Sequence, residues 1–228
     1  MGENKRQKGF FYITRNSIVV YDDILPAPLV FPFDRNVVAD FEIISKEDFT
    51  KQFVAFLQQN KVTPGVVAIV LGEDAFFEKE VPMMERAKKD EVIKLFIESV
   101  PFEHVATNSF PTKTGSILIA TNKDFFNAII EITAKLGFIV QYVIPAYYFD
   151  KKITTVDQLT ARYILDKIPS LRQASLLGVV EEKHIEPAIS EVMTTKKEKN
   201  KLPILIAIFL ILTLILAGVI YFSMQQTP

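Results

Sequence analysis

The chain has 228 residues, with 26 basic and 27 acidic side chains, and its net charge at pH 7 is −1. This near-neutral balance provides no overall attraction to nucleic acid, and the absence of cysteine excludes thiol catalysis and thiolate metal sites. All charged residues precede residue 202, which leaves about 200 residues for one sizeable core or two small subdomains.

The N-terminal part of the chain is predicted to be β-rich. Residues 1–8 contain no export or myristoylation signal, and we expect them to be flexible. Two β-rich arms between Phe10 and Asp22 flank Arg15-Asn16-Ser17, a pattern that predicts a hairpin. The proline-containing stretch from Asp23 to Phe33 predicts an extended surface loop, and residues 37–44 predict a third strand.

A helix and a buried strand are expected next. Ser45 followed by Asp48 resembles a capping box, and apolar residues then recur at helical spacing as far as Asn60. These apolar residues are Phe49, Phe53, Phe56 and Leu57. The run "VVAIVL", residues 66–71, has no polar alternation, which is typical of a central strand covered on both faces.

The pattern restarts after Gly72. Residues 75–81 predict a short strand, and residues 85–99 predict an amphipathic helix that ends before Pro101. We expect this helix to bury Val92, Leu95 and Phe96.

A further strand, helix and strand are expected after this helix. Residues 116–121 predict a strand, after which Asn122 is expected to cap a helix. The expected buried side of that helix consists of Phe125, Phe126, Ile129, Ile130 and Thr133. Gly137 lies where a helix C-terminus needs a positive φ, and residues 138–144 predict the strand that follows.

The order of elements predicts an α/β (α+β) layered domain over residues 9–150, with two subdomains at about 9–71 and 72–150. Residues 151–185 are expected to form a helical extension, with a helix from Thr155 to about Ile168 that Pro169 ends. This helix is expected to use Val156, Leu159, Tyr163 and Ile164. Residues 186–201 are polar and Lys-rich and are interpreted as a linker.

A long apolar run lies between Leu202 and Phe222. Its twenty-one residues carry no charge, and a helix of this length reaches about 31 Å, roughly one bilayer core. Four lysines precede the run, and residues 223–228 contain none, so the positive-inside rule places the N-terminal domain in the cytoplasm. These boundary residues are Lys196, Lys197, Lys199 and Lys201. We therefore expect a single-pass inner-membrane protein with a lipid bilayer as one partner and a short extracytoplasmic tail.

The arrangement of motifs between residues 9 and 150 resembles the PilM family of type IV pilus machinery and the related cytoplasmic part of GspL in type II secretion. The motifs are "FEKEVP", "FIESVPFEHV" and "LIATNKDFFNAIIEITAKLGFIVQYVIP". The residues that match the family are Pro82, Glu98, Pro101, Phe102 and Gly137. The resemblance implies the first half of an actin-like ATPase fold and, as partners, proteins of a pilus or secretion platform.

Two departures from the family bear on catalysis. The second half of an actin-like fold has no room between residue 150 and the apolar run. The family's first phosphate-binding loop carries Asp and Gly between the opening strands, where this chain reads "TRNS", residues 14–17. We therefore expect a non-catalytic scaffold with no cofactor and no nucleic-acid partner, and homodimer formation is left open. The alternative is a reduced actin-like nucleotide-binding switch, an ATPase.

Other candidate sites are interpreted as structural. The "KTGS" motif at residues 113–116 lacks the accompanying elements of a serine β-lactamase site and predicts a turn. His104 lacks a Ser or Cys nucleophile nearby in sequence. The group Glu182, His184 and Glu186 and the acidic pairs at residues 22–23 and 73–74 are expected to be solvated. We expect no catalytic residue and no metal ligand.

Overall fold

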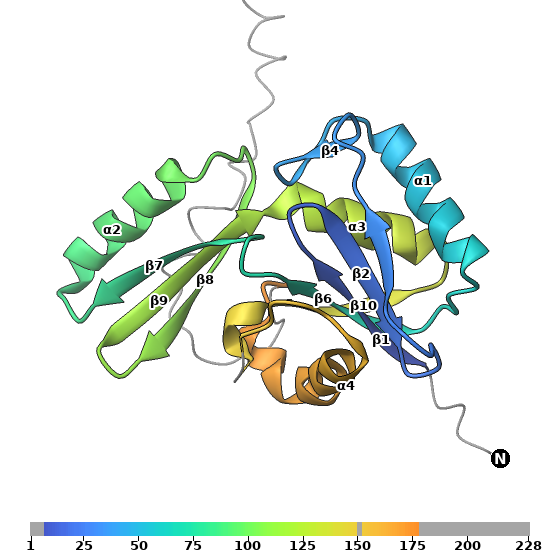
Figure 1. Ribbon diagram of the computed structural model, residues 1–228. Helices are drawn as coiled ribbons and strands as arrows, with labels where there is room; N and C mark the ends of the chain where they lie inside the picture. Colours follow the sequence, from blue (N-terminus) through green and yellow to red (C-terminus); the bar gives the residue numbers. More distant parts are fainter. Residues whose placement is uncertain (1–6, 150–151, 178–228) are drawn as a thin grey trace, which may run out of the picture. The chain divides into compact units, whose positions relative to one another are not determined.

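The computed structural model describes residues 7–149 and 152–177, which belong to one compact unit (Figure 1). Its strands are β1 (Lys8–Ile13), β2 (Ser17–Asp22), β3 (Leu29–Pro32), β4 (Val38–Ala39), β5 (Glu42–Ile43), β6 (Val66–Leu71), β7 (Phe77–Pro82), β8 (Val105–Thr112), β9 (Gly115–Asn122) and β10 (Ile139–Pro145). Its helices are α1 (Lys46–Gln59), α2 (Arg86–Ser99), α3 (Lys123–Lys135) and α4 (Gln158–Lys167), with short 3-10 helices η1 (Ala146–Tyr148) and η2 (Ile168–Ala174). The expected mixed α/β class is confirmed.

A five-stranded sheet in the order β10-β6-β1-β2-β3 forms the centre of the unit. β6 lies parallel to both β1 and β10, whereas β2 lies antiparallel to both β1 and β3. The uninterrupted apolar sequence of β6 suits this interior position, because a strand between two others and between two layers has no face in water. The prediction of a central strand at residues 66–71 is therefore confirmed.

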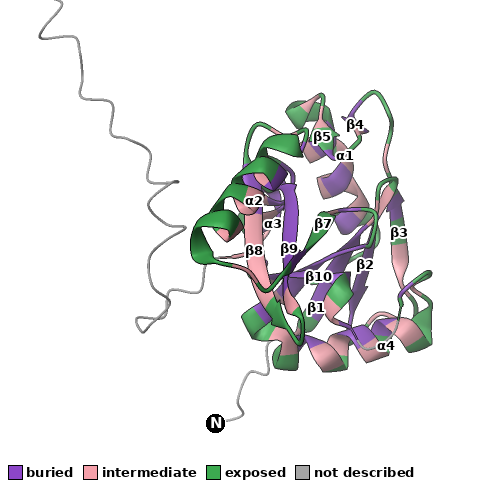
Figure 2. Cartoon of the chain, turned by 90° about the vertical axis from the view of Figure 1, so that its left-hand side faces the viewer, coloured by how far each residue is buried: buried purple, intermediate pink, exposed green. Residues whose placement is uncertain are grey.

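Helices cover both faces of this sheet (Figure 1). Successive residues of a strand point to opposite faces, so Phe11 and Ile13 of β1 belong to the core beneath α1 and α3. Phe10 and Tyr12 belong to a second core, which includes α4. In Figure 2 the strands of the sheet are largely buried, whereas the helices present exposed outer sides. The result is an α/β/α arrangement of three layers.

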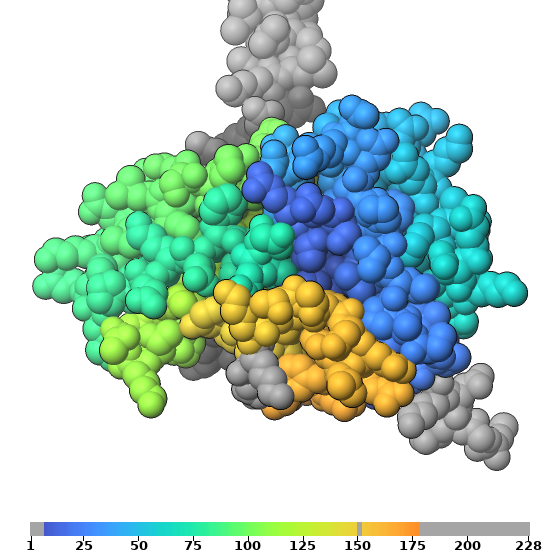
Figure 3. Space-filling model, viewed as in Figure 1, coloured from blue at the N-terminus to red at the C-terminus, as the bar shows by residue number. Residues whose placement is uncertain are grey.

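The segment from residue 152 to residue 177 completes the α4 layer, and Figure 3 shows it in yellow and orange along the lower part of one face. The Tyr12 hydroxyl donates to the Ile153 carbonyl at 3.3 Å, and burial raises the pKa of this phenol above its usual value. At the edge of β10, the Val143 N–H donates to Ser175 Oγ and the Leu176 N–H donates to the Val143 carbonyl. These bonds cover part of a sheet edge that would otherwise carry unpaired backbone groups.

A second, three-stranded antiparallel sheet has the order β7-β9-β8. α2 packs on it through a small core that includes Val81, Phe96 and Leu118. The chain then returns to the first sheet, because α3 packs on that sheet and β10 pairs with β6. Residues after Gly72 therefore contribute to both sheets, whereas the sequence predicted a separate subdomain for residues 72–150.

Two expectations for the N-terminal third are wrong. Leu29–Pro32 is a strand rather than a loop, and Pro32 is tolerated because β3 lies at the edge of the sheet. Residues 37–44 do not form one strand. They form the short β4–β5 hairpin, because Asp40 and Phe41 have φ values of 50° and 64° that no strand accommodates.

Two further corrections concern the second half of the unit. Strand β8 was not predicted, because Asn108, Ser109 and Pro111 interrupt any apolar pattern there. Leu95 of α2 and Leu159 of α4, both expected inside, are 56% and 77% exposed. The expected end of the helix before Pro169 is confirmed, because α4 stops at Lys167; the chain then continues as the 3-10 helix η2, whose first positions accept proline.

Gly137 has a φ of 91°, which confirms the expected left-handed residue after α3. A Cβ at this position would make only an ordinary contact, 3.5 Å from Pro64 Cβ. Replacing Gly137 with Ala should therefore cost only the backbone strain, about 1 kcal/mol of unfolding free energy, and replacing it with Asn should cost less. Chemical denaturation followed by circular dichroism measures both, and equal losses for Ala and Asn would contradict this reasoning.

Several expectations lie outside the described residues. They concern the linker at 186–201 with its four lysines, the apolar run from Leu202 to Phe222, the tail at 223–228, and the group Glu182, His184 and Glu186. Across residues 7–149 and 152–177, no helix has the length and apolar character needed to cross a bilayer.

Candidate functional site

The turn between β1 and β2 is the position at which the sequence departs from the phosphate-binding loop that the resemblance implies. The backbone amides of residues 14–16 are all bonded within the chain. The Thr14 N–H donates to the Ser17 carbonyl at 2.9 Å, and the Asn16 N–H donates to Thr14 Oγ1 at 3.3 Å. The Arg15 N–H donates to Asp74 Oδ2 at 2.9 Å. A phosphate at this turn would therefore find these three amides occupied and would meet the Asp74 carboxylate, which repels it.

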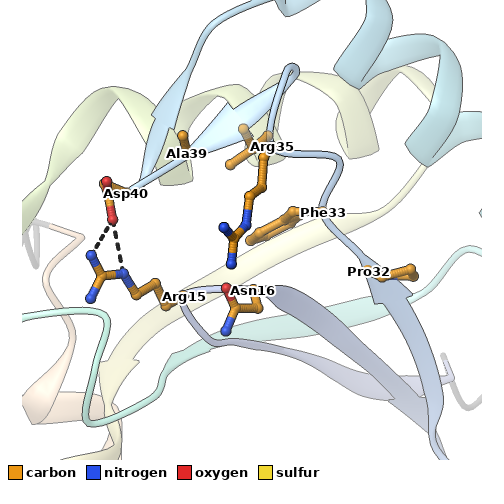
Figure 4. Close-up of a pocket in the computed structure, with 8 residues that line it drawn as sticks. Arg15, Asn16, Pro32, Phe33, Arg35, Ala39 and Asp40 are labelled. Carbon is orange, nitrogen blue, oxygen red and sulfur yellow. Dashed lines mark hydrogen bonds and ion pairs between the residues drawn. The ribbon is translucent and has the colours of Figure 1, made fainter.

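A cleft of about 650 Å³ lies beside this turn (Figure 4). Arg15 and Asn16 line it from the β1–β2 turn, Phe33 and Arg35 line it from the segment after β3, and Asp40 lines it from the β4–β5 turn. The Phe33 ring lies 5.8 Å from the ring of Phe125, 6.2 Å from that of Phe31 and 6.4 Å from that of Phe49. This aromatic packing gives the cleft a fixed apolar wall.

The β4–β5 turn holds Asp40 at the cleft in an unusual backbone conformation. A two-residue hairpin turn with positive φ at both positions favours Asn or Asp followed by Gly, but here Asp40 is followed by Phe41. Phe41 is buried with its ring 5.9 Å from that of Phe125, and its carbonyl accepts a hydrogen bond from Asn122 Nδ2 at 2.9 Å. Contacts elsewhere in the fold therefore stabilise a strained turn, and such strain is concentrated at functional sites.

Three of the eight residues that line the cleft are charged. Arg15 Nε donates to Asp40 Oδ1 at 2.8 Å, and a second guanidinium N–H of Arg15 donates to the same oxygen. The two side chains are 61% and 71% exposed, and an ion pair this exposed contributes at most about 1 kcal/mol. Arg35 is also exposed and forms no ion pair with any residue that the structure describes. The cleft thus has one weakly neutralised guanidinium and one unneutralised guanidinium.

A second cleft of about 510 Å³ lies between β5 and α3, and four of its five charged lining residues are acidic. The carboxylates that line it belong to Glu42, Glu103, Asp124 and Glu131. The Lys46 ammonium, 2.8 Å from Glu131 Oε2, lowers the pKa of that carboxyl below its usual value. Within the described part of the chain, no three or more His, Asp or Glu side chains are grouped to hold a metal ion.

His104 lies at this acidic side of the unit with its Nδ1 2.8 Å from Asp124 Oδ2. The hydrogen bond to Asp124, and then the charge of that carboxylate, raise the pKa of His104 above its ordinary value of 6.5. A raised folded-state pKa means that this pair stabilises the fold below pH 6.5 and that the contribution is lost as the pH rises through the folded-state pKa.

We expect NMR titration of the imidazole to give a pKa above 6.5 for His104 and a value closer to 6.5 in the Asp124→Asn variant. The chain has two histidines, so a His104→Gln variant assigns the imidazole signal of His104 in each spectrum. An unchanged pKa for His104 in Asp124→Asn would show that the Asp124 carboxylate does not cause the shift.

The residues that carry the family resemblance do not meet at the Arg15–Asp40 cleft. Pro82 ends β7, Glu98 is exposed near the end of α2, and Gly137 follows α3. Pro101 and Phe102 follow α2, and Phe102 packs against both the first core and the core beneath α2. These positions contribute to the fold, and their place in a partner interface stays a prediction.

The KTGS motif and the two acidic pairs, which the sequence analysis interpreted as structural, have structural roles in the fold. "KTGS" forms the β8–β9 turn and the start of β9, as expected. Asp22 is buried rather than solvated, at 5% exposed, and its carboxylate accepts the N–H groups of Ile24 and Leu25 at 2.8 Å, which is the local hydrogen bonding expected of a turn aspartate. Glu73 pairs with Lys152 at 2.9 Å, and Asp74 bonds the Arg15 amide.

Sequence reasoning identified only one side of the cleft, the "TRNS" turn. It missed Phe33 and Asp40, because they come from segments interpreted as a loop and a single strand, and Arg35, which lies between these two segments. The signal in the sequence was weak, because Asp-Phe lacks the glycine that usually marks a tight hairpin.

No family model matches the chain, and no curated protein matches it. Solved structures show partial similarity. A PilM–PilN type IV pilus biogenesis complex has a TM-score of 0.38 and 13% identity, covering 64% of this chain and 47% of that one. The cytoplasmic domain of EpsL, an inner membrane component of the type II secretion system of Vibrio cholerae, has a TM-score of 0.37 and 11% identity, covering 61% and 55%.

A protein of unknown function with an actin-like ATPase fold from Bacteroides thetaiotaomicron has a TM-score of 0.35 and 13% identity, covering 62% of this chain and 55% of that one. This chain therefore spans about half the length of the proteins it resembles. Similarity at this level does not transfer an activity or a partner, because function resides in sites rather than in folds.

Proposed function

We propose that the chain is a non-catalytic, membrane-anchored scaffold that docks proteins of a type IV pilus or type II secretion-like assembly platform at the cytoplasmic face of the inner membrane. The observation that carries the proposal is the β1–β2 turn, whose amides at residues 14–16 are already bonded and whose Arg15 amide faces the Asp74 carboxylate. A turn in this state favours a role in docking over a role in nucleotide chemistry, because these backbone donors are not available to a phosphate.

The sequence supports the membrane part of the proposal. The uncharged run from Leu202 to Phe222 and the four lysines before it have the length and charge of a single span with its N-terminal side in the cytoplasm. Such an anchor confines the domain to a surface and raises its effective concentration near partners in the same membrane. Modest interfaces are then sufficient for docking.

Calorimetric titration of the full-length chain in nanodiscs with Mg-ATP separates this proposal from the nucleotide-binding switch. We expect no saturable heat. Micromolar binding would contradict the proposal and favour the switch. The Asp74→Asn variant extends the test by removing the carboxylate that opposes phosphate while keeping an acceptor oxygen for the Arg15 amide. Weak nucleotide binding that appears only in this variant would confirm that the Asp74 carboxylate keeps phosphate away from the β1–β2 turn.

A further inference from the structure

We propose that the cleft between the β1–β2 and β4–β5 turns binds one carboxylate side chain on a docking segment of a partner protein, and that Asp40 competes with that carboxylate inside the free protein. The inference rests on the proposed docking function and deepens it by naming the chemistry that the partner presents. Three features of the cleft support it, namely its charge, its apolar wall and the strained turn that carries Asp40.

The charge of the cleft matches a single negative group. Arg15 and Arg35 contribute two positive charges and Asp40 contributes one negative charge, so one positive charge is left over. A single carboxylate neutralises this excess, and the planar guanidinium fork suits carboxylate geometry. A phosphate carries up to two charges at neutral pH, which exceeds the single positive charge left over in the cleft.

The wall of the cleft adds an apolar contact beside the cations. In Figure 4 the Arg35 side chain extends past the Phe33 ring toward Asn16. Pro32 and Phe33 line the same cleft, and Phe33 is held by its aromatic neighbours. A segment with an apolar residue next to Asp or Glu would place its carboxylate on Arg35 and its apolar side chain on this wall. A small free anion would use only the first of these contacts.

Asp40 can be displaced without unfolding the turn. Its ion pair with Arg15 is exposed on both sides, so the pair is weak, and no other hydrogen bond holds the Asp40 side chain in the described residues. The turn itself is stabilised through Phe41, by its buried ring and by the bond from Asn122 to its carbonyl. An incoming carboxylate can therefore take over Arg15 while the backbone stays in place.

The test is NMR titration of the arginine Nε–H signals of the full-length chain in nanodiscs. The probe is the peptide Ac-Leu-Glu-Leu-amide, and the matched control is Ac-Leu-Gln-Leu-amide, which lacks only the charge. Inorganic phosphate is the third titrant. We expect the Glu peptide to shift the Arg35 and Arg15 signals saturably and to bind more tightly than the Gln peptide or phosphate.

Variants assign the effect to the cleft. Asp40→Asn removes the competing charge but keeps a residue that tolerates positive φ, and should tighten Glu-peptide binding about two- to fivefold. Arg35→Gln should weaken it about fivefold or more, whereas Arg172→Gln, an exposed arginine on η2, should leave it unchanged. The signals of a folded protein in each spectrum exclude unfolding as the cause.

Three results would overturn the inference. They are equal shifts with the Glu and Gln peptides, no saturable shift with either peptide, and phosphate binding that is tighter than peptide binding and depends on Arg35. None of them would overturn the docking function itself, because a partner could still bind another surface of the unit. Crosslinking in native membranes tests that function separately.

Discussion

Replacing Phe53 with Ala is expected to lower the free energy of unfolding by about 3–5 kcal/mol. Phe53 is fully buried in α1, where it stacks on Phe49 at 5.9 Å and contacts Phe31 at 5.1 Å and Phe11 at 5.9 Å. The large effect follows because the truncation leaves a cavity among rigid rings that cannot collapse to fill it. Urea denaturation followed by circular dichroism measures this loss, since the chain has no tryptophan for fluorescence.

This measurement uses a chain that ends at residue 201, which we predict to fold without the apolar run. Leu159→Ala on the exposed side of α4 is the matched control and should change stability by less than about 0.5 kcal/mol. A loss of less than about 1 kcal/mol for Phe53→Ala would contradict the rigid aromatic packing around α1.

Replacing Asn122 with Ala is expected to cost about 2–4 kcal/mol, the second largest effect, because this side chain serves two elements at once. Its Oδ1 accepts the N–H groups of Asp124 and Phe125 and caps α3. Its Nδ2 donates to the carbonyl of Phe41 in the β4–β5 turn. Loss of the cap contributes about 1 kcal/mol, and the unsatisfied Phe41 carbonyl contributes the remainder. Thermal or urea unfolding gives the total.

Asn122→Ser separates the two contributions. A serine is also a good N-cap acceptor for α3, but its shorter neutral side chain does not reach the Phe41 carbonyl, so this variant isolates the cost to the turn. We expect it to lose less stability than Asn122→Ala. Equal losses in both variants would show that the bond to Phe41 dominates, and no loss in either variant would contradict the dual role of Asn122.

The elements that the sequence predicted best are those whose local pattern agrees with their tertiary position. The α1 helix was predicted from Ser45 to Asn60, because a cap and an apolar stripe coincide there, and the structure has these residues as its two caps. The β6 strand and the α3 helix were predicted for similar reasons. In the two helices the buried positions follow the helical period, and β6 is apolar throughout.

Edge elements were predicted less well, because their existence depends on a neighbour rather than on their own sequence. Within residues 7–149 and 152–177, strand β3 contains Pro32 and pairs only with β2, and strand β8 contains Pro111 and pairs only with β9. A proline interrupts the strand signal but is tolerated where one edge remains free. The return of β10 to the first sheet is likewise a long-range pairing with β6 that periodicity does not encode.

In the candidate site, too, the features within one segment could be predicted from the sequence, whereas the contacts between distant segments could not. The sequence identified the "TRNS" turn as a departure from a phosphate loop. The structure adds that the Arg15 N–H donates a hydrogen bond to Asp74, fifty-nine residues later in the chain. The ion pair between Arg15 and Asp40 depends on the β4–β5 turn, which is stabilised by the hydrogen bond from Asn122 to the Phe41 carbonyl. Contacts across such distances follow from the fold and not from residue spacing.

The central claim is that a membrane anchor holds this domain against protein partners. Lysine-directed crosslinking in native membranes, followed by mass spectrometry, tests it most directly, because exposed lysines such as Lys46 and Lys113 lie on separate elements of the described unit. The account predicts crosslinks from the full-length chain to subunits of a pilus or secretion platform, and their loss when residues 202–222 are deleted. Crosslinks that persist after residues 202–222 are deleted would contradict the account. So would a full-length chain that is released from membranes and forms no such crosslinks.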